Sequence, residues 1–252
     1  MHFAGFDHVS LAQLALVAGV ALFASIVGGV AGYGTGALMP LVLVPMIGAE
    51  PVVPIIAISA MFTNSSRTVA FFRFVDWRRA IIVMLGAALP CVAGAYGYTL
   101  LTNKGALIVI GTMLCLSVPL RRILKRRNVV LGDRGLAASA VGYGVLVGGT
   151  TGSGVILLAM LMSAGVSGAG VIATDAIISI VVGIIKISVF GFAGVLTVQV
   201  VSFALLIGFV ALPGAFLARA FVERMPVHVH TAILDAVVIC GGAFMIFSAF
   251  RR

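Results

Sequence analysis

Apolar residues dominate the chain in long runs that are separated by short polar or charged stretches. Most runs are long enough to cross a hydrocarbon core of about 30 Å as a helix that rises about 1.5 Å per residue. We expect ten helical segments, with approximate bounds 11–31, 37–47, 52–71, 80–101, 105–120, 135–148, 155–164, 169–190, 196–218 and 229–250.

Two of these segments, 37–47 and 155–164, are too short to span the core alone. Each follows a glycine-rich stretch, Gly28–Gly36 in the first case and Gly148–Gly154 in the second. Because glycine costs about 1 kcal/mol relative to alanine in a helix interior, we expect the helix to break there. The pattern predicts two half-helices, each paired with the preceding segment in a re-entrant hairpin or a broken span.

The glycine-rich breaks have two interpretations. Non-helical backbone at membrane depth is tolerated where it is buried in protein or lines a wet cavity, and paired breaks in two halves point to a transporter's binding site. The alternative is close helix packing through small residues. Since two breaks occur at corresponding places, we favour the binding site.

The chain divides into two similar halves, 1–120 and 135–252, around a basic cytoplasmic hinge loop at 121–134. Three matches recur in order: Gly34-Thr35-Gly36 with Gly152-Ser153-Gly154, Ala57-Ile58-Ser59 with Ala173-Thr174-Asp175, and Leu89-Pro90 with Leu212-Pro213. Because each half has an odd number of segments, the halves must lie inverted. The predicted fold class is an all-α polytopic membrane protein with two inverted repeats, each containing one glycine-rich broken helix or re-entrant hairpin.

Composition supports the membrane class, since 62% of the residues are hydrophobic, 9% are charged and the mean hydropathy is +1.26. The net charge of +9 comes largely from the hinge, where the basic residues are Arg121, Arg122, Lys125, Arg126, Arg127 and Arg134. A basic loop between apolar segments is typical of the cytoplasmic side. We therefore expect the lipid bilayer as a partner and no nucleic acid.

The same rule orients the chain in the membrane. If the segments alternate from an outside N-terminus, the basic residues that join the hinge on the inside are Arg73, Arg78, Arg79, Arg219 and Arg224. Lys104, Arg251 and Arg252 then lie outside, and the last two count against this orientation. The N-terminus lacks the positive region of a signal peptide, so we expect the first apolar segment to be retained.

Two cations lie within apolar segments, Arg67 and Lys186, 33 and 34 residues after Gly34 and Gly152. A charge near the bilayer centre costs at least about 2.5 kcal/mol on insertion scales. Two such cations with few acids nearby suggest a bound anion as counter-charge. The alternative is that each side chain extends to the membrane surface.

Polar residues precede both cations along the same helices. Asn64 lies on the helical face of Arg67. Asp175 precedes Lys186 by eleven residues, or about 16 Å along a helix, which is too far for a direct ion pair. Asp175 can instead cap its helix, pair with another segment or carry a coupled proton.

The glycine-rich breaks supply the other elements of an anion site. A half-helix that starts after Gly36 or Gly154 directs backbone N–H groups and its positive dipole end into the break. Thr35 and Ser153 add hydroxyl donors. The residues without side chains that let an oxyanion approach the backbone are Gly34, Gly36, Gly152 and Gly154.

No arrangement of catalytic residues is evident. The four His residues lie near segment ends, and the three Cys residues lack the spacing of a metal site or a disulfide framework. A nucleophile with a nearby base cannot be assembled from the apolar segments. We expect no enzymatic activity, no cofactor, no metal and no catalytic residue.

The chain resembles the TauE/SafE family of sulfite exporters, also grouped as 4-toluenesulfonate uptake permeases. The resemblance is carried by Gly28–Pro40, Ala57–Asn64, Gly148–Gly154 and Ala173–Asp175, together with the basic central loop. It implies secondary transport of small organosulfur anions or other anionic metabolites in a bacterial inner membrane. One departure is Leu158, which stands where the first half has Pro40 and makes the half-helices unequal.

The leading hypothesis is a secondary transporter that exports a small organosulfur oxyanion, sulfite or a sulfonate, by alternating access. The proton gradient or the membrane potential would drive export. The alternatives are a passive anion channel, a transporter of another small carboxylate or oxyanion, and a membrane scaffold, against which the short loops argue. A homodimer is a further expectation.

Overall fold

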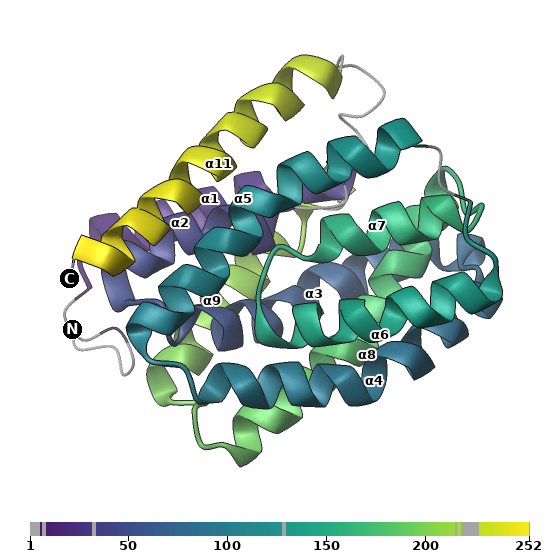
Figure 1. The fold of residues 1–252 in the computed structure, drawn as a ribbon. Coiled ribbons are helices and arrows are strands. Elements are labelled where there is room, and N and C mark those ends of the chain that lie inside the picture. Colours follow the sequence, from purple (N-terminus) through teal and green to yellow (C-terminus); the bar gives the residue numbers. More distant parts are fainter. Residues whose placement is uncertain are drawn as a thin grey trace.

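The structure is a computed structural model that describes residues 6, 9–31, 34–127, 130–214, 216–217 and 227–251. Within these residues every regular element is helical (Figure 1). The elements are α1 (Leu11–Ala31), α2 (Thr35–Ile47), α3 (Val52–Phe71), η1 (Phe72–Phe74), α4 (Trp77–Thr99), α5 (Asn103–Arg127), α6 (Asp133–Gly149), α7 (Gly154–Ser163), α8 (Ala169–Phe192), α9 (Val198–Ala211) and α11 (Val227–Arg251). The predicted all-α class is confirmed.

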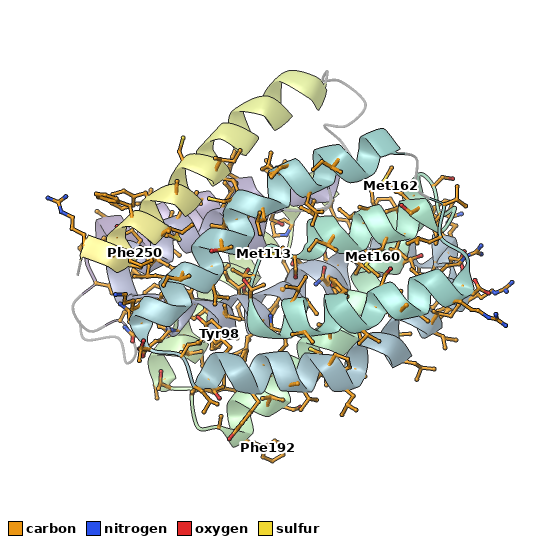
Figure 2. All side chains as sticks on the ribbon, viewed as in Figure 1. Tyr98, Met113, Met160, Met162, Phe192 and Phe250 are labelled. Atoms are coloured by element: carbon orange, nitrogen blue, oxygen red, sulfur yellow. The ribbon has the colours of Figure 1, made fainter. Side chains whose placement is uncertain are left out.

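Five helices are long and apolar enough to cross a membrane: α1, α3, α4, α5 and α8. Large apolar side chains cover much of their outer surface, as expected for a lipid-facing protein. Figure 2 shows Phe192 and Phe250 pointing away from the bundle, and these two side chains are 94% and 70% exposed. The protein is therefore a multi-pass membrane protein.

The two predicted half-helices are present as α2, with 13 residues, and α7, with 10 residues. Ala49, just after α2, donates its N–H to Asn103 Oδ1 at 2.7 Å and accepts from the Tyr98 hydroxyl at 2.8 Å. Leu131, just before α6, donates to the Ser163 carbonyl at the end of α7 at 2.7 Å. Each half-helix thus returns to the end of the molecule from which the preceding helix came, which is the geometry of a re-entrant hairpin (Figure 1).

Two boundaries differ from the sequence-based expectation. The basic hinge is not a loop throughout, because α5 continues to Arg127; lysine and arginine are good helix formers and can extend a helix beyond the bilayer. The segment expected at 196–218 ends as the regular helix α9 at Ala211. Pro213 follows this end, and proline lacks the N–H that would continue the helix.

Helices α3 and α8 pack against each other at the centre of the molecule. Around them, α4 packs against α6 and α8, while α9 packs against α1 and α3, and α5 packs against α11. The α4–α6 contact depends on small residues: an ideal Cβ on Gly148 would overlap the Cys91 carbonyl. Close packing, the alternative interpretation of the glycine stretches, therefore applies to Gly148.

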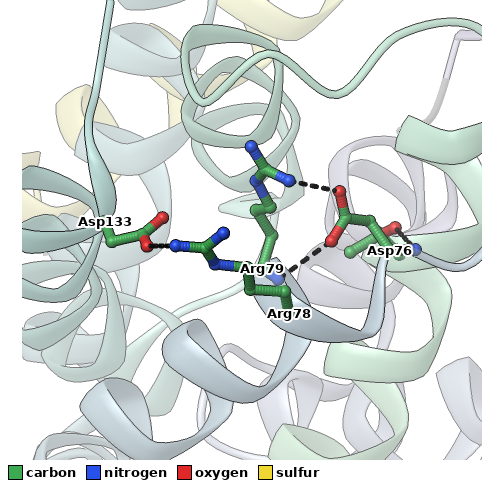
Figure 3. A network of polar contacts seen from close by, with 5 residues as sticks. Asp76, Arg78, Arg79 and Asp133 are labelled. Atoms are coloured by element: carbon green, nitrogen blue, oxygen red, sulfur yellow. Dashed lines mark hydrogen bonds and ion pairs between the residues drawn. The ribbon is translucent and has the colours of Figure 1, made fainter.

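A polar network holds the end of the molecule where α4 and α6 begin (Figure 3). Asp76 caps α4 by accepting from the Arg79 N–H at 3.1 Å and from Arg79 Nη1 at 3.0 Å. The Arg78–Asp133 ion pair joins α4 to the start of α6. Lys104 and Arg251 belong to the helix ends at the opposite side of the bundle, in agreement with alternating segments (Figure 1).

Candidate functional site: a central anion cavity

The two glycine-rich breaks meet in the middle of the molecule. Thr151 Oγ1 donates a hydrogen bond of 2.8 Å to the Gly36 carbonyl, although the residues are 115 positions apart. An ideal Cβ on Gly36 would lie 3.1 Å from Gly152 N. Gly152 has φ +81°, a left-handed conformation that favours glycine. The crossing of the hairpin tips therefore leaves little room for a Cβ at Gly36, and the backbone conformation at Gly152 favours glycine.

A cavity of about 140 Å³ lies at this crossing. A single water needs roughly 10–15 Å³ by the same measure, so the cavity has room for several waters or one small oxyanion. All ten predicted site residues line it: Gly34, Thr35, Gly36, Asn64, Arg67, Gly152, Ser153, Gly154, Lys186 and Asp175. The structure brings the predicted residues together, and their role in anion binding stays a prediction.

Both half-helices begin at the cavity. Thr35 starts α2 and Gly154 starts α7, so the positive ends of two helix dipoles point into one space. The first N–H groups of a helix have no acceptor within the helix. Ser153 occupies the N-cap position of α7 without using its side chain as a cap, which leaves the hydroxyl available to a ligand.

Arg67 is buried, with 8% of its surface exposed, so it does not extend to the membrane surface. Its Nη2 forms an ion pair with Asp175 Oδ2, and its Nη1 donates to Asn64 Oδ1 at 3.3 Å. Asp175 thus supplies a counter-charge to Arg67 from within the protein, and the binding of an anion by Arg67 stays a prediction. Among the alternatives for Asp175, pairing with another segment is the one observed.

Two buried atoms of this ion pair have no hydrogen-bond partner among the described residues: Arg67 Nε and Asp175 Oδ1. Buried polar atoms are normally satisfied, and atoms left open at a cavity mark a place where water or a ligand binds. Within this ion pair, Arg67 Nε can therefore still donate a hydrogen bond and Asp175 Oδ1 can still accept one.

Lys186 is also buried, with 6% of its surface exposed. Its ammonium donates to the carbonyls of Val147 at 2.7 Å and Thr150 at 3.0 Å. These carbonyls lie at the C-terminal end of α6, where the helix dipole is negative. No carboxylate pairs with Lys186 within the part of the chain that the structure describes. The partial negative charges of the carbonyls balance only part of the positive charge of Lys186, and a negatively charged ligand would balance the rest.

The sequence-based reasoning missed Ser25 of α1 as a cavity-lining residue. Its hydroxyl donates to the Ala211 carbonyl at 2.6 Å and so satisfies the end of α9. A single serine in an apolar segment gives no periodic signal, and only the packing of α1 on α9 places it at the cavity.

A larger cavity of about 530 Å³ lies between α2, α5 and α11. Its lining is mainly apolar, with polar groups from Asn103, Ser248 and Arg251 near the helix ends. It contains neither a half-helix N-terminus nor a buried cation, so the central cavity is the candidate functional site. Among the described residues no group of three or more His, Cys, Asp or Glu side chains could hold a metal ion.

A multi-pass helical membrane protein with two half-helices facing a central cavity lined by buried ionisable side chains has the organisation of a membrane transport protein. The chain belongs to the sulfite exporter TauE/SafE family, whose family model matches residues 17–245. No curated protein and no solved structure matches the chain. The resemblance drawn from the glycine-rich motifs is confirmed, and membership implies transport of a small anion across a lipid bilayer rather than enzymatic catalysis.

Proposed function

We propose that the protein is a secondary transporter that exports a small organosulfur oxyanion, sulfite or a sulfonate, across a bacterial inner membrane by alternating access. The observation that carries this proposal is the convergence of two half-helix N-termini and the buried side chain of Lys186 on one central cavity. Fixed dipoles and a cation in a site of low dielectric constant stabilise an anion more than the same groups in water do.

In this proposal the oxyanion binds between the two hairpin tips. Its oxygens accept hydrogen bonds from the N–H groups that begin α2 and α7 and from the hydroxyls of Thr35 and Ser153. Lys186 supplies charge compensation from α8, and Arg67 with Asn64 completes the site from α3. The bare backbone of Gly34, Gly36, Gly152 and Gly154 allows the anion to approach closely.

The packing supports two inverted repeats as the basis of alternating access. Suppose that α1, α3 and α4 of the first half correspond to α6, α8 and α9 of the second half. Helix α4 packs against α6 and α8, and its counterpart α9 packs against α1 and α3, which are the counterparts of α6 and α8. The two halves therefore make equivalent contacts with each other. The hairpins α1–α2 and α6–α7 return to opposite ends of the molecule. Rocking of one repeat against the other would expose the cavity to each side in turn.

The membrane potential favours export of an anion from a cell that is negative inside. Each charge gains about 2.3 kcal/mol per 100 mV of potential, so export needs little further driving force. A proton that enters the cell in exchange for the anion would add to this driving force, whereas a proton carried out with the anion would reduce it.

The proposal is tested with purified protein in proteoliposomes loaded with sulfite. We expect saturable transport that sulfite on the opposite side stimulates, and we expect Lys186→Ala to reduce binding about tenfold or more, since it removes a charge-assisted contact. Lys104→Ala is the matched control, because Lys104 is exposed at a helix end, and it should bind as the wild type does.

Three results would contradict this reading. Large currents without saturation would indicate a passive channel. Transport of small carboxylates in place of sulfite or sulfonates would assign another substrate. Equal binding by Lys186→Ala and Lys104→Ala would remove Lys186 from the site.

A further inference from the structure

The ionisable side chains at the central cavity have unequal numbers of each sign. Arg67, Lys186 and Asp175 line it, and with all three ionised the net charge is +1. An uncompensated charge in a site of low dielectric constant is costly. A monovalent anion therefore brings the occupied cavity to neutrality, whereas a divalent anion leaves one negative charge in excess.

Asp175 is the group that can remove this excess. Its Oδ2 pairs with Arg67, while its Oδ1 is buried and unpartnered among the described residues. A carboxyl group at this position can take up a proton and neutralise one negative charge. Protonation also weakens the ion pair, which leaves the Arg67 guanidinium available to an anion in the same cavity.

The surroundings of Asp175 contain few other ionisable groups. On the elements packed against α8, the titratable or charged side chains are Arg67 on α3, Arg73 on η1, Asp76 before α4, Arg78, Arg79, Cys91, Tyr96 and Tyr98 on α4, and Asp133, Arg134 and Tyr143 on α6. Helix α7 carries none. Arg67 is the residue that forms an ion pair with Asp175 in the described part of the chain, so a change of charge at Asp175 acts first on Arg67.

We propose that Asp175 is a resident counter-ion that takes up a proton or stays ionised according to the charge of the bound anion, and so keeps the occupied cavity neutral. A monovalent oxyanion, such as a sulfonate, binds while Asp175 is ionised and paired with Arg67. A divalent oxyanion binds together with one proton on Asp175, so that Arg67 and Lys186 both face the ligand. This inference rests on the proposed transport function and defines how many protons accompany an anion of each charge.

The proton balance of the divalent case is simple. One proton adds to the Asp175 carboxylate as the dianion enters, and no covalent bond to the anion forms. When the anion leaves on the other side, the proton dissociates from the carboxyl group and the Asp175–Arg67 ion pair forms again. One proton and one dianion therefore move together, carrying one net negative charge, the same charge as a monovalent anion alone.

The test uses two tetrahedral anions of fixed charge near neutral pH, methanesulfonate with one charge and sulfate with two. Calorimetric titration of the purified protein in buffers of different ionisation enthalpy measures the protons taken up on binding. In the wild type we expect uptake of about one proton with sulfate and none with methanesulfonate. Sulfate affinity should fall as the pH rises, while methanesulfonate affinity should stay constant.

The variant Asp175→Asn removes the titrating group. We expect it to bind sulfate without proton uptake and to favour sulfate over methanesulfonate by a further factor on the order of ten, because a negative charge has left the cavity. Asp133→Asn is the matched control, since Asp133 is paired with Arg78 at an exposed site, and it should behave as the wild type does.

The outcomes separate this inference from the proposed function. Sulfate binding without proton uptake in the wild type, or proton uptake that persists in Asp175→Asn, would overturn the role of Asp175 and leave the transporter proposal standing. Failure of both anions to bind the wild type would count against the anion cavity itself. If Asp175→Asn does not fold, the wild-type proton count still decides the question.

Discussion

Single residues determine the charge of the cavity. The sequence shows Arg67, Asp175 and Lys186 as ionisable side chains within apolar segments, and the structure shows how each is compensated. The Arg67–Asp175 pair joins residues that are 108 positions apart. No local pattern links residues at that separation, so the pairing could not be assigned from sequence alone.

Breaking this buried ion pair should destabilise the protein. Arg67→Gln or Asp175→Asn leaves one buried charge without its partner, which typically costs about 3–5 kcal/mol. The double variant should lose less stability than the sum of the two single losses, because neither charge then remains. Thermal unfolding in detergent, followed by circular dichroism, measures this coupling.

The exposed pair Arg78–Asp133 provides the comparison for that experiment, with side chains that are 70% and 42% exposed. Surface ion pairs contribute about 0–1 kcal/mol, so Arg78→Gln and Asp133→Asn should change the unfolding temperature little. Equal losses at both pairs would show that burial does not distinguish them.

At the scale of helices, the site depends on two short helices, α2 and α7, whose starting points are determined by the local sequence. Glycine-rich sequence interrupts the helix before Thr35 and before Gly154, and both interruptions were predicted from composition alone. The stretch 148–154 nevertheless has two roles, since Gly148 packs against α4 whereas Gly152 turns at the cavity. Only the packing of neighbouring helices separates these roles.

Gly152→Ala should disrupt the hairpin tip. Its φ of +81° costs a residue with a Cβ about 1–2 kcal/mol, and the tip contacts Gly36 of the other hairpin. We expect lower thermal stability and weaker anion binding. Gly97→Ala is the control, because a Cβ at Gly97 meets no atom within 4 Å and alanine favours the helix. Full binding by Gly152→Ala would show that the tip conformation is not needed.

At the scale of the whole molecule, the charged ends of the bundle predict its orientation. Arg78 and Arg79 lie at the end where α4 begins, and Lys104 and Arg251 belong to helix ends at the other side. The positive-inside rule assigns the first of these ends to the cytoplasm. The hairpin α1–α2 then enters from outside and α6–α7 from the cytoplasm.

Labelling with a membrane-impermeant maleimide tests this orientation in intact cells. In a variant without the three native cysteines, Lys104→Cys should react from outside, whereas Arg78→Cys should react only after the membrane is permeabilised. The reverse pattern would invert the orientation, and labelling of both in intact cells would contradict alternating segments.

The sequence by itself determined the membrane class, the two short helices, the membership of the family and a set of residues that line the central cavity. It did so because the length of each apolar segment and the position of each glycine-rich break are local properties of the sequence. In a bilayer these properties decide which segments span the membrane and which form half-helices. The tertiary structure alone decided that the hairpin tips touch, that Asp175 neutralises Arg67, and that Lys186 binds carbonyls at the end of α6. These contacts join distant segments, and their pairing follows from packing in three dimensions that periodicity along the chain does not encode.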